Sequence, residues 1–215
     1  LPTLIIPVAG VLVMGLLMMY VIGKPLTAMS TGLTGWLAGM STESAIILGL
    51  IHGCMIAFDM GGPLNKASYA FALAASEAGN WIPLTTSCIA AMTPPLGIAI
   101  AILISRRKFT KVERSALPGL ITGALCEITG FAIPFAVSDP FRVIPSLMAG
   151  SAVTGALCYA FSMTLHAPHG GMFVVFLCDN PLLFVLFWLI GGAITAACLL
   201  LLKKPLSPDE LAAEE

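Results

Sequence analysis

Charged residues are scarce in this sequence. Asp, Glu, Lys and Arg make up 10% of the 215 residues, against roughly 25% in an ordinary soluble domain. Hydrophobic residues make up 58%, and the mean hydropathy is +0.99. A soluble fold of this length needs a charged surface. The composition therefore excludes a water-soluble domain and favours an all-α integral membrane protein in contact with a lipid bilayer.

Several kinds of functional site are also missing. The net charge is −1, and no basic stripe is interleaved with aromatic residues, which excludes a nucleic-acid surface. The six cysteines lack C-x-x-C spacing and are typical of buried thiols that pack as small hydrophobes. No Cys/His metal cluster, Ser/His/Asp triad or phosphate-binding loop has usable spacing. We expect no metal, no cofactor and no nucleic-acid partner. The first residues lack a basic region, so we expect no signal peptide.

Long charge-free runs mark the candidate membrane spans. A helix needs about 20 apolar residues to cross the hydrocarbon layer, and these windows qualify: residues 3–22, 81–104, 143–165 and 182–202, with a Thr-Pro-Pro interruption inside the second. The sequence predicts a multi-pass membrane domain over residues 1–202 and a cytoplasmic tail over 203–215.

Positive residues set the orientation. The basic run at 106–114 and the Lys203-Lys204 pair should both face the cytoplasm. An even number of crossings must then separate them, and the spans 143–165 and 182–202 supply two. Residues 115–142 must therefore enter and leave the membrane on the same side, which predicts a re-entrant hairpin.

The first unexpected polar cluster is Asp59-Met-Gly-Gly-Pro-Leu-Asn-Lys66, between two short apolar segments. Gly and Pro break helices, and broken backbone at membrane depth survives only where it lines a protein-buried or wet cavity. Such interrupted segments point to a transporter's substrate site. Asp59, Asn65 and Lys66 together suit a sugar or polyol. The alternative is a loop on the membrane surface with solvated charges.

The second cluster runs from Glu127 to Arg142 and is interrupted by prolines. Asp139 and Arg142 are three residues apart, so they can pair as a structural clamp if a helix starts there. Glu127 is isolated in an apolar stretch. It is either a general base for a hydroxyl group or a neutral group hydrogen-bonded to backbone.

Three histidines complete the set of candidates. His52 lies within an apolar segment, which favours a packing role. His166 and His169 flank a proline before Gly170-Gly171. A glycine-rich turn with an imidazole can approach a ligand closely, or it can be an ordinary turn between helices.

Six stretches carry a family resemblance. They are Ala57-Phe-Asp-Met-Gly-Gly-Pro-Leu-Asn-Lys66, Thr93-Pro-Pro-Leu-Gly-Ile-Ala99, Ala132-Ile-Pro-Phe-Ala136, Asp139-Pro-Phe-Arg-Val-Ile-Pro-Ser146, Ala149-Gly-Ser-Ala-Val-Thr-Gly-Ala156 and Ala167-Pro-His-Gly-Gly-Met-Phe173. In this order, over nearly the whole chain, they resemble the membrane (IIC) component of the fructose family of the bacterial phosphotransferase system.

The resemblance implies a sugar channel that hands its substrate to the phosphocysteine of a IIB component, itself supplied by IIA. It also implies a homodimer in the bacterial inner membrane, with two re-entrant hairpins containing residues 59–66 and 127–140. Two departures stand out. The family's further N-terminal segments are absent, so the chain resembles a C-terminal portion. The family's second hairpin reads Ile-Thr-Glu-Gly, whereas Gly130 takes the glutamate's place here, and Glu127 lies three residues earlier.

The sequence therefore predicts a permease subunit that binds a fructose-like hexose for coupled phosphorylation. In this prediction Asp59, Asn65 and Lys66 bind sugar hydroxyls, and Glu127 orients or deprotonates the accepting hydroxyl. Three further residues belong to the substrate site, namely His169, Asp139 and Arg142, the last of which could receive the donor's phosphate. The alternative is an ion- or proton-coupled secondary sugar transporter, with Asp59 and Glu127 as coupling carboxylates.

Overall fold

A computed structural model describes residues 2–17, 19–20, 28, 31–32, 35 and 45–205. These residues contain no β-strand, only an isolated bridge between Leu165 and Cys178. The α-helices are α1 (Pro2–Leu17), α3 (Ala45–Phe58), α4 (Pro63–Glu77), α5 (Ile82–Ile104), α6 (Lys111–Ser115), α7 (Leu117–Cys126), α8 (Ile133–Ser138), α9 (Pro140–Ala160) and α10 (Pro181–Leu202). Short 3-10 helices are η3 (Arg106–Lys108), η4 (Thr129–Ala132) and η5 (Gly171–Leu177).

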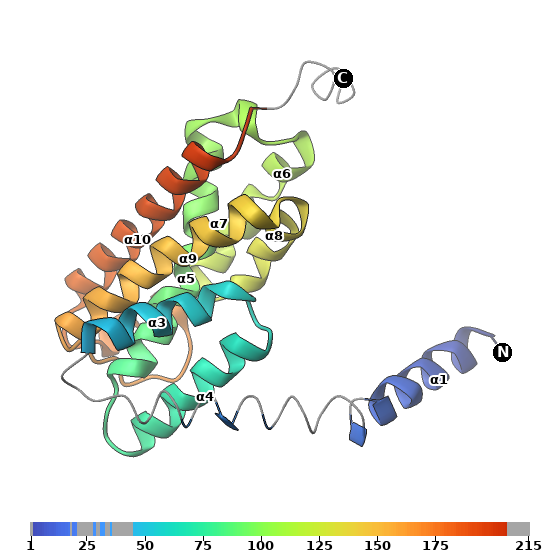
Figure 1. Cartoon of the computed structure of the whole chain (residues 1–215), viewed down its shortest axis with the longest axis horizontal. Helices are drawn as coiled ribbons and strands as arrows, with labels where there is room; N and C mark the ends of the chain where they lie inside the picture. Colours follow the sequence, from blue (N-terminus) through green and yellow to red (C-terminus); the bar gives the residue numbers. More distant parts are fainter. Residues whose placement is uncertain are drawn as a thin grey trace.

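Among the described residues, three helices are long and apolar enough to cross a membrane. They are α5, α9 and α10, with 23, 21 and 22 residues. At about 1.5 Å per residue each is at least roughly 30 Å long, the thickness of the hydrocarbon layer. They confirm an all-α, multi-pass membrane protein and three of the predicted spans. The remaining predicted span, residues 3–22, contains helix α1 (Pro2–Leu17). This helix lies apart from the other helices in Figure 1. Residues 206–215 of the predicted tail lie outside the described residues.

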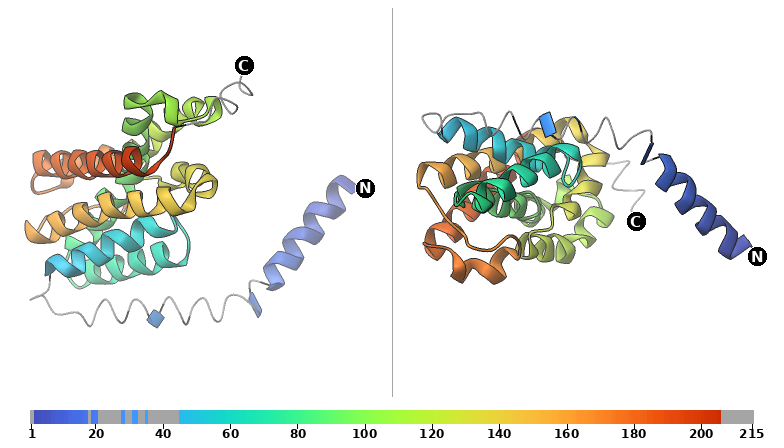
Figure 2. Two further views of the ribbon diagram at one scale, coloured as in Figure 1. Left: turned by 45° about the horizontal axis from the view of Figure 1, so that its top comes forward. Right: turned by 90° about the horizontal axis from the view of Figure 1, so that it is seen from below.

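Helix α9 lies between α3 and α10, and α5 packs against all three (Figures 1 and 2). Helices α3 and α9 approach closely because small residues face each other. A Cβ atom on Gly53 would collide with the carbonyl oxygen of Ser151, and one on Gly155 with that of Gly49. Small residues let helix backbones meet in this way inside membranes. The contact fixes the start of the first hairpin against the long helices.

Helix α5 is continuous through Pro94 and Pro95, although the sequence suggested an interruption there. Proline has no N–H, so Pro94 leaves the carbonyl group of Ala90 without its usual helical donor. The hydroxyl group of Ser151 on α9 donates to this oxygen at 3.0 Å. A neighbouring helix therefore satisfies the freed backbone group, as a membrane interior requires.

The basic segment and the end of α10 lie at the same end of the bundle. Lys203 Nζ is 2.7 Å from Glu113 Oε1, and Lys108 Nζ donates to the carbonyl oxygen of Lys203. A buried cluster that includes Ile102, Phe109, Val143 and Leu199 brings the end of α5 and the start of α9 to this end too. Residues 115–138 therefore leave this end along α7 and return to it along η4 and α8.

Candidate functional site

Asp59 holds the turn of the first hairpin, between α3 and α4. Its carboxylate accepts hydrogen bonds from the backbone N–H groups of Leu64 (2.7 Å) and Asn65 (3.0 Å), at the N-terminus of α4. A negative charge is favourable there because the first N–H groups of a helix have no helical partner. Gly61 has φ +118°, a conformation that side chains disfavour. The local sequence thus specifies a tight, acid-capped turn.

Helix α4 presents two of the predicted residues. Asn65 is buried, and its Nδ2 donates to the carbonyl oxygen of Ile56 at 2.6 Å. Lys66 is exposed and forms no ion pair with any described residue. Tyr69, one helical turn beyond Asn65, donates from Oη to the carbonyl oxygen of Pro168 at 2.7 Å. This bond ties the first hairpin to the histidine-containing loop.

Glu127 lies at the tip of the second hairpin, where α7 ends in a left-handed conformation (φ +62°). Its side chain is 4% exposed. The Oε2 atom accepts hydrogen bonds from the backbone N–H groups of Gly170 (3.0 Å) and Gly171 (3.1 Å). It also lies 3.3 Å from Cys88 Sγ and 3.4 Å from His169 Nδ1. All these interactions converge on one carboxylate oxygen.

The two glycines make this arrangement possible. Both have positive φ, 138° for Gly170 and 57° for Gly171, and a Cβ atom on Gly171 would collide with the carbonyl oxygen of Leu125. Successive N–H groups can therefore point at one anion, as in other backbone anion sites. The other oxygen of Glu127, Oε1, has no hydrogen-bond partner among the described residues. One oxygen is fixed, and the other can accept a ligand hydroxyl group.

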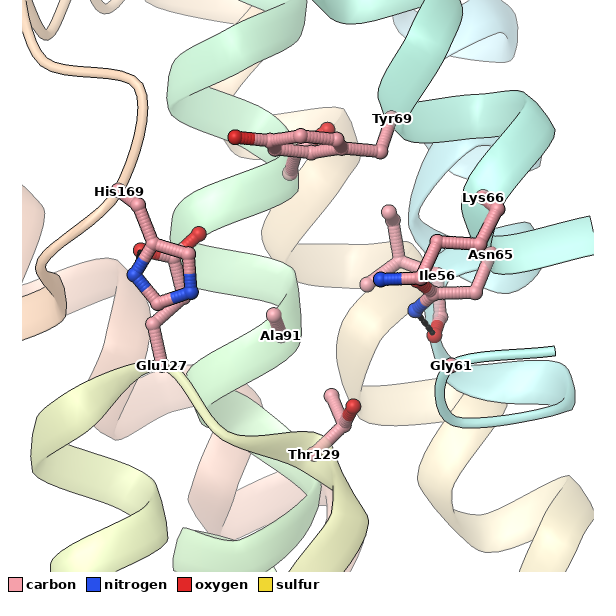
Figure 3. A pocket seen from close by; sticks show the side chains of 10 residues that line it. Ile56, Gly61, Asn65, Lys66, Tyr69, Ala91, Glu127, Thr129 and His169 are labelled. Atoms are coloured by element: carbon pink, nitrogen blue, oxygen red, sulfur yellow. Dashed lines mark hydrogen bonds and ion pairs between the residues drawn. The ribbon is translucent and has the colours of Figure 1, made fainter. Parts of the chain in front are cut away.

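These elements enclose a cavity of about 100 Å³. Figure 3 shows His169 and Glu127 on one side, facing Asn65 and Lys66 on the other, with Tyr69 and Thr129 between them. The lining is Ile56, Gly61, Asn65, Lys66, Tyr69, Ser87, Ala91, Glu127, Thr129 and His169. A mixture of hydroxyl, amide, carboxylate and cationic groups suits a polar, hydroxyl-rich molecule.

The cavity contains four of the predicted site residues, namely Asn65, Lys66, Glu127 and His169. The other three are not among its lining residues. Asp59 caps α4, as described above. Asp139 and Arg142 form an ion pair of 2.9 Å at the start of α9, the clamp that their spacing allowed.

Sequence reasoning missed Tyr69, Ser87 and Thr129. Tyr69 follows Asn65 at a spacing of four residues, a signal that it shares a helix face with Asn65. Ser87 and Thr129 carry no such signal, because a hydroxyl group in an apolar helix is common.

The chain is 45% identical over 204 residues to a "Fructose permease IIC component" of Bacillus amyloliquefaciens, a match that covers 95% of this chain and 67% of that protein. The chain belongs to the fructose permease IIC family. A "PTS system fructose-specific EIIB'BC component" of Xanthomonas campestris is 46% identical over 209 residues, covering 96% of this chain and 36% of that protein. A fructose-specific EIIABC component of Bacillus subtilis is 43% identical, covering 96% of this chain and 32% of that protein.

This IIC-family chain thus spans about a third of the length of its EIIB'BC and EIIABC relatives. The names of these relatives combine a IIC component with IIB or with IIA and IIB components. No family model and no solved structure matches the chain.

Proposed function

We propose that this chain is the sugar-handling part of a fructose permease, in which a fructose-like hexose binds in the cavity and is phosphorylated during transport. The proposal depends mainly on one observation. Glu127 lines the cavity, its Oε2 accepts from Gly170 and Gly171, and its Oε1 has no hydrogen-bond partner among the described residues. A carboxylate held this way can orient or deprotonate an attacking hydroxyl group. The names of the relatives, fructose permeases, support the substrate class.

The neighbouring residues would each bind a different part of the sugar. Asn65, Lys66 and His169 would bind sugar hydroxyl groups across the cavity from one another. Asp59 would keep α4 in place for this purpose. Arg142, paired with Asp139 at the start of α9, would face the incoming phosphate of the donor. It lies at the end of the bundle that contains the basic segment, where positive residues favour the cytoplasm.

The partners follow from this role. The phosphoryl donor would be the phosphocysteine of a IIB component, itself supplied by IIA, since relatives contain these components in the same chain. We place the protein in the bacterial inner membrane as a homodimer. Both hairpins, α3–α4 and α7–α8, would dip into the bilayer without crossing it, because α7 with 10 residues is about 15 Å long, half the hydrocarbon thickness.

A vesicle assay tests the proposal. Membrane vesicles containing the permease are given labelled fructose with or without phosphorylated IIB. We expect fructose phosphate only when the phosphorylated donor is present. An ionophore that collapses ion gradients should leave the rate unchanged. Delivery of unmodified fructose that stops on addition of the ionophore would instead support an ion- or proton-coupled transporter, which the relatives' names do not favour.

A further inference from the structure

Three buried polar side chains, joined by hydrogen bonds, form a polar chain that ends at the wall of the cavity. His52 on α3 is fully buried. Its Nδ1 lies 3.3 Å from the hydroxyl oxygen of Tyr159 on α9, and its Nε2 lies 3.0 Å from Oγ of Ser87 on α5. Ser87 lines the cavity together with Ala91, one turn further along the same face of α5. The polar chain therefore crosses three helices and ends at the cavity.

The direction of the hydrogen bonds follows from where the one unpaired hydroxyl proton can find an acceptor. Each imidazole nitrogen either donates or accepts, so two arrangements are possible. If His52 donated to Tyr159, the phenolic proton would be buried without an acceptor, since His52 is the only partner of this hydroxyl among the described residues. If Tyr159 donates to Nδ1, then Nε2 donates to Ser87 Oγ. This second arrangement leaves the hydroxyl proton of Ser87, and not that of Tyr159, without an acceptor in the protein. Ser87 lines the cavity and Tyr159 does not, so a ligand in the cavity can accept this proton and pair the last buried donor.

Ser87 also differs from its neighbours on α5. Thr85 and Thr86 donate their hydroxyl protons to the carbonyl oxygens one turn back, those of Trp81 (3.0 Å) and Ile82 (2.9 Å). Ser87 makes no such bond, and its oxygen is engaged by His52 instead. Its proton is therefore available to an acceptor in the cavity, which Ser87 lines.

We infer that Ser87 is a sugar-contacting residue that donates a hydrogen bond to the bound hexose. His52 and Tyr159 are positioning residues that keep the Ser87 proton directed into the cavity. This inference rests on the proposed function, because it assumes that a sugar occupies the cavity. The expected ligand atom is an acceptor, namely the oxygen of a sugar hydroxyl group or of the sugar ring.

The test measures binding of labelled fructose to the purified complete permease without IIB, in four variants. Ser87→Ala should weaken binding about tenfold, the loss expected for one hydrogen bond. The two His52 variants provide a matched pair. The amide of His52→Gln reaches the position of Nε2 and can still donate to Ser87, so its affinity should stay within about threefold of the wild type. The amide of His52→Asn reaches only the position of Nδ1, so it should lose about as much as Ser87→Ala.

The fourth variant, Ser87→Ala with His52→Asn, should bind no more weakly than Ser87→Ala alone, because both changes remove the same bond. In the donor-dependent reaction the loss should appear in KM, with kcat nearly unchanged. Ser115→Ala, which changes an exposed serine far from the cavity, is the control, and thermal unfolding shows that each variant is folded.

The outcomes separate this inference from the proposed function. If the wild-type permease does not bind fructose, the proposed function is wrong, and this inference falls with it. If the wild type binds but Ser87→Ala binds equally well, only the inference is overturned. Equal losses in His52→Gln and His52→Asn would show that His52 has a packing role alone, and would overturn the positioning role.

Discussion

Oε2 of Glu127 lies 3.4 Å from Nδ1 of His169, so the tip of the second hairpin and the histidine loop meet at one carboxylate oxygen. The same oxygen accepts the N–H groups of Gly170 and Gly171. Because neither segment could shift without losing these contacts, the shape of the cavity depends on both. The carboxylate that lines the cavity comes from position 127. Gly130 is not among the residues lining the cavity.

Glu127→Gln should abolish most of the phosphorylation while preserving the fold. The amide oxygen can still accept the two glycine N–H groups, but the amide nitrogen cannot accept a proton from a sugar hydroxyl. Loss of a general base costs about 10²–10⁴-fold in rate. Donor-dependent formation of fructose phosphate measures the effect. Glu77→Gln, at an exposed position at the end of α4, is the control. A near-normal rate in Glu127→Gln would exclude the general-base role.

Lys66→Ala should weaken sugar binding without destabilising the protein. The side chain is exposed, lines the cavity and makes no ion pair with any described residue, so its loss disturbs no structural partner. A hydrogen bond from a charged group contributes about 1.5–3 kcal/mol, or roughly 10–100-fold in affinity. Fructose binding without IIB provides the measurement. The control is Lys204→Ala, which changes an exposed lysine outside the cavity. Unchanged affinity in Lys66→Ala would remove this lysine from the site.

The sequence was sufficient to locate α5, α9 and α10, because the length of a charge-free run depends on the chain alone. It also singled out Glu127 and Lys66, which line the cavity. Ionisable groups inside apolar segments can be recognised from the sequence alone. Asp59 has the same signal, yet its carboxylate turns back onto α4. Which way a side chain turns depends on the backbone of the loop, and no spacing rule reports that.

Ser87 shows a second limit of the sequence. Serines and threonines in membrane helices commonly bond to their own helix, as Thr85 and Thr86 do. Only the packing of α3 against α5 brings His52 to Ser87 and makes its hydroxyl group different. Lys203 shows the same limit. The sequence indicated only that this lysine faces the cytoplasm, whereas its ion pair with Glu113 depends on tertiary structure.

Gly53→Val should destabilise the bundle. Any side chain at this position would meet the carbonyl oxygen of Ser151, and a helix backbone cannot yield locally. Overpacking typically costs about 1–3 kcal/mol, and a backbone collision belongs to the upper part of that range. A lower midpoint of thermal unfolding in detergent is expected. Gly10→Val on α1 has open space around the new side chain and should leave the midpoint unchanged. Equal midpoints for the two variants would contradict the close α3–α9 contact.

The ion pair between Glu113 and Lys203 should couple in a double-mutant cycle. The side chains are only 14% and 10% exposed, and Lys203 also lies over the ring of Phe109. Glu113→Gln or Lys203→Met alone leaves a partly buried charge without its partner, at a cost of about 1–3 kcal/mol. Removing both should cost less than the sum of the single changes. Unfolding free energies of the three variants provide the check, and strict additivity would show that the pair is not coupled.

Ser68→Ala should leave stability unchanged or raise it. Ser68 is fully buried on α4, and its hydroxyl oxygen has no hydrogen-bond partner among the described residues. A buried hydroxyl group without a partner carries an uncompensated desolvation cost of about 1–3 kcal/mol, which alanine removes at little expense in packing. Ser146→Ala is the matched comparison, because this buried hydroxyl donates to the carbonyl oxygen of Arg142 at 2.7 Å. Thermal unfolding should rank Ser68→Ala above Ser146→Ala. The reverse order would mean that Ser68 has a partner in the membrane-embedded protein.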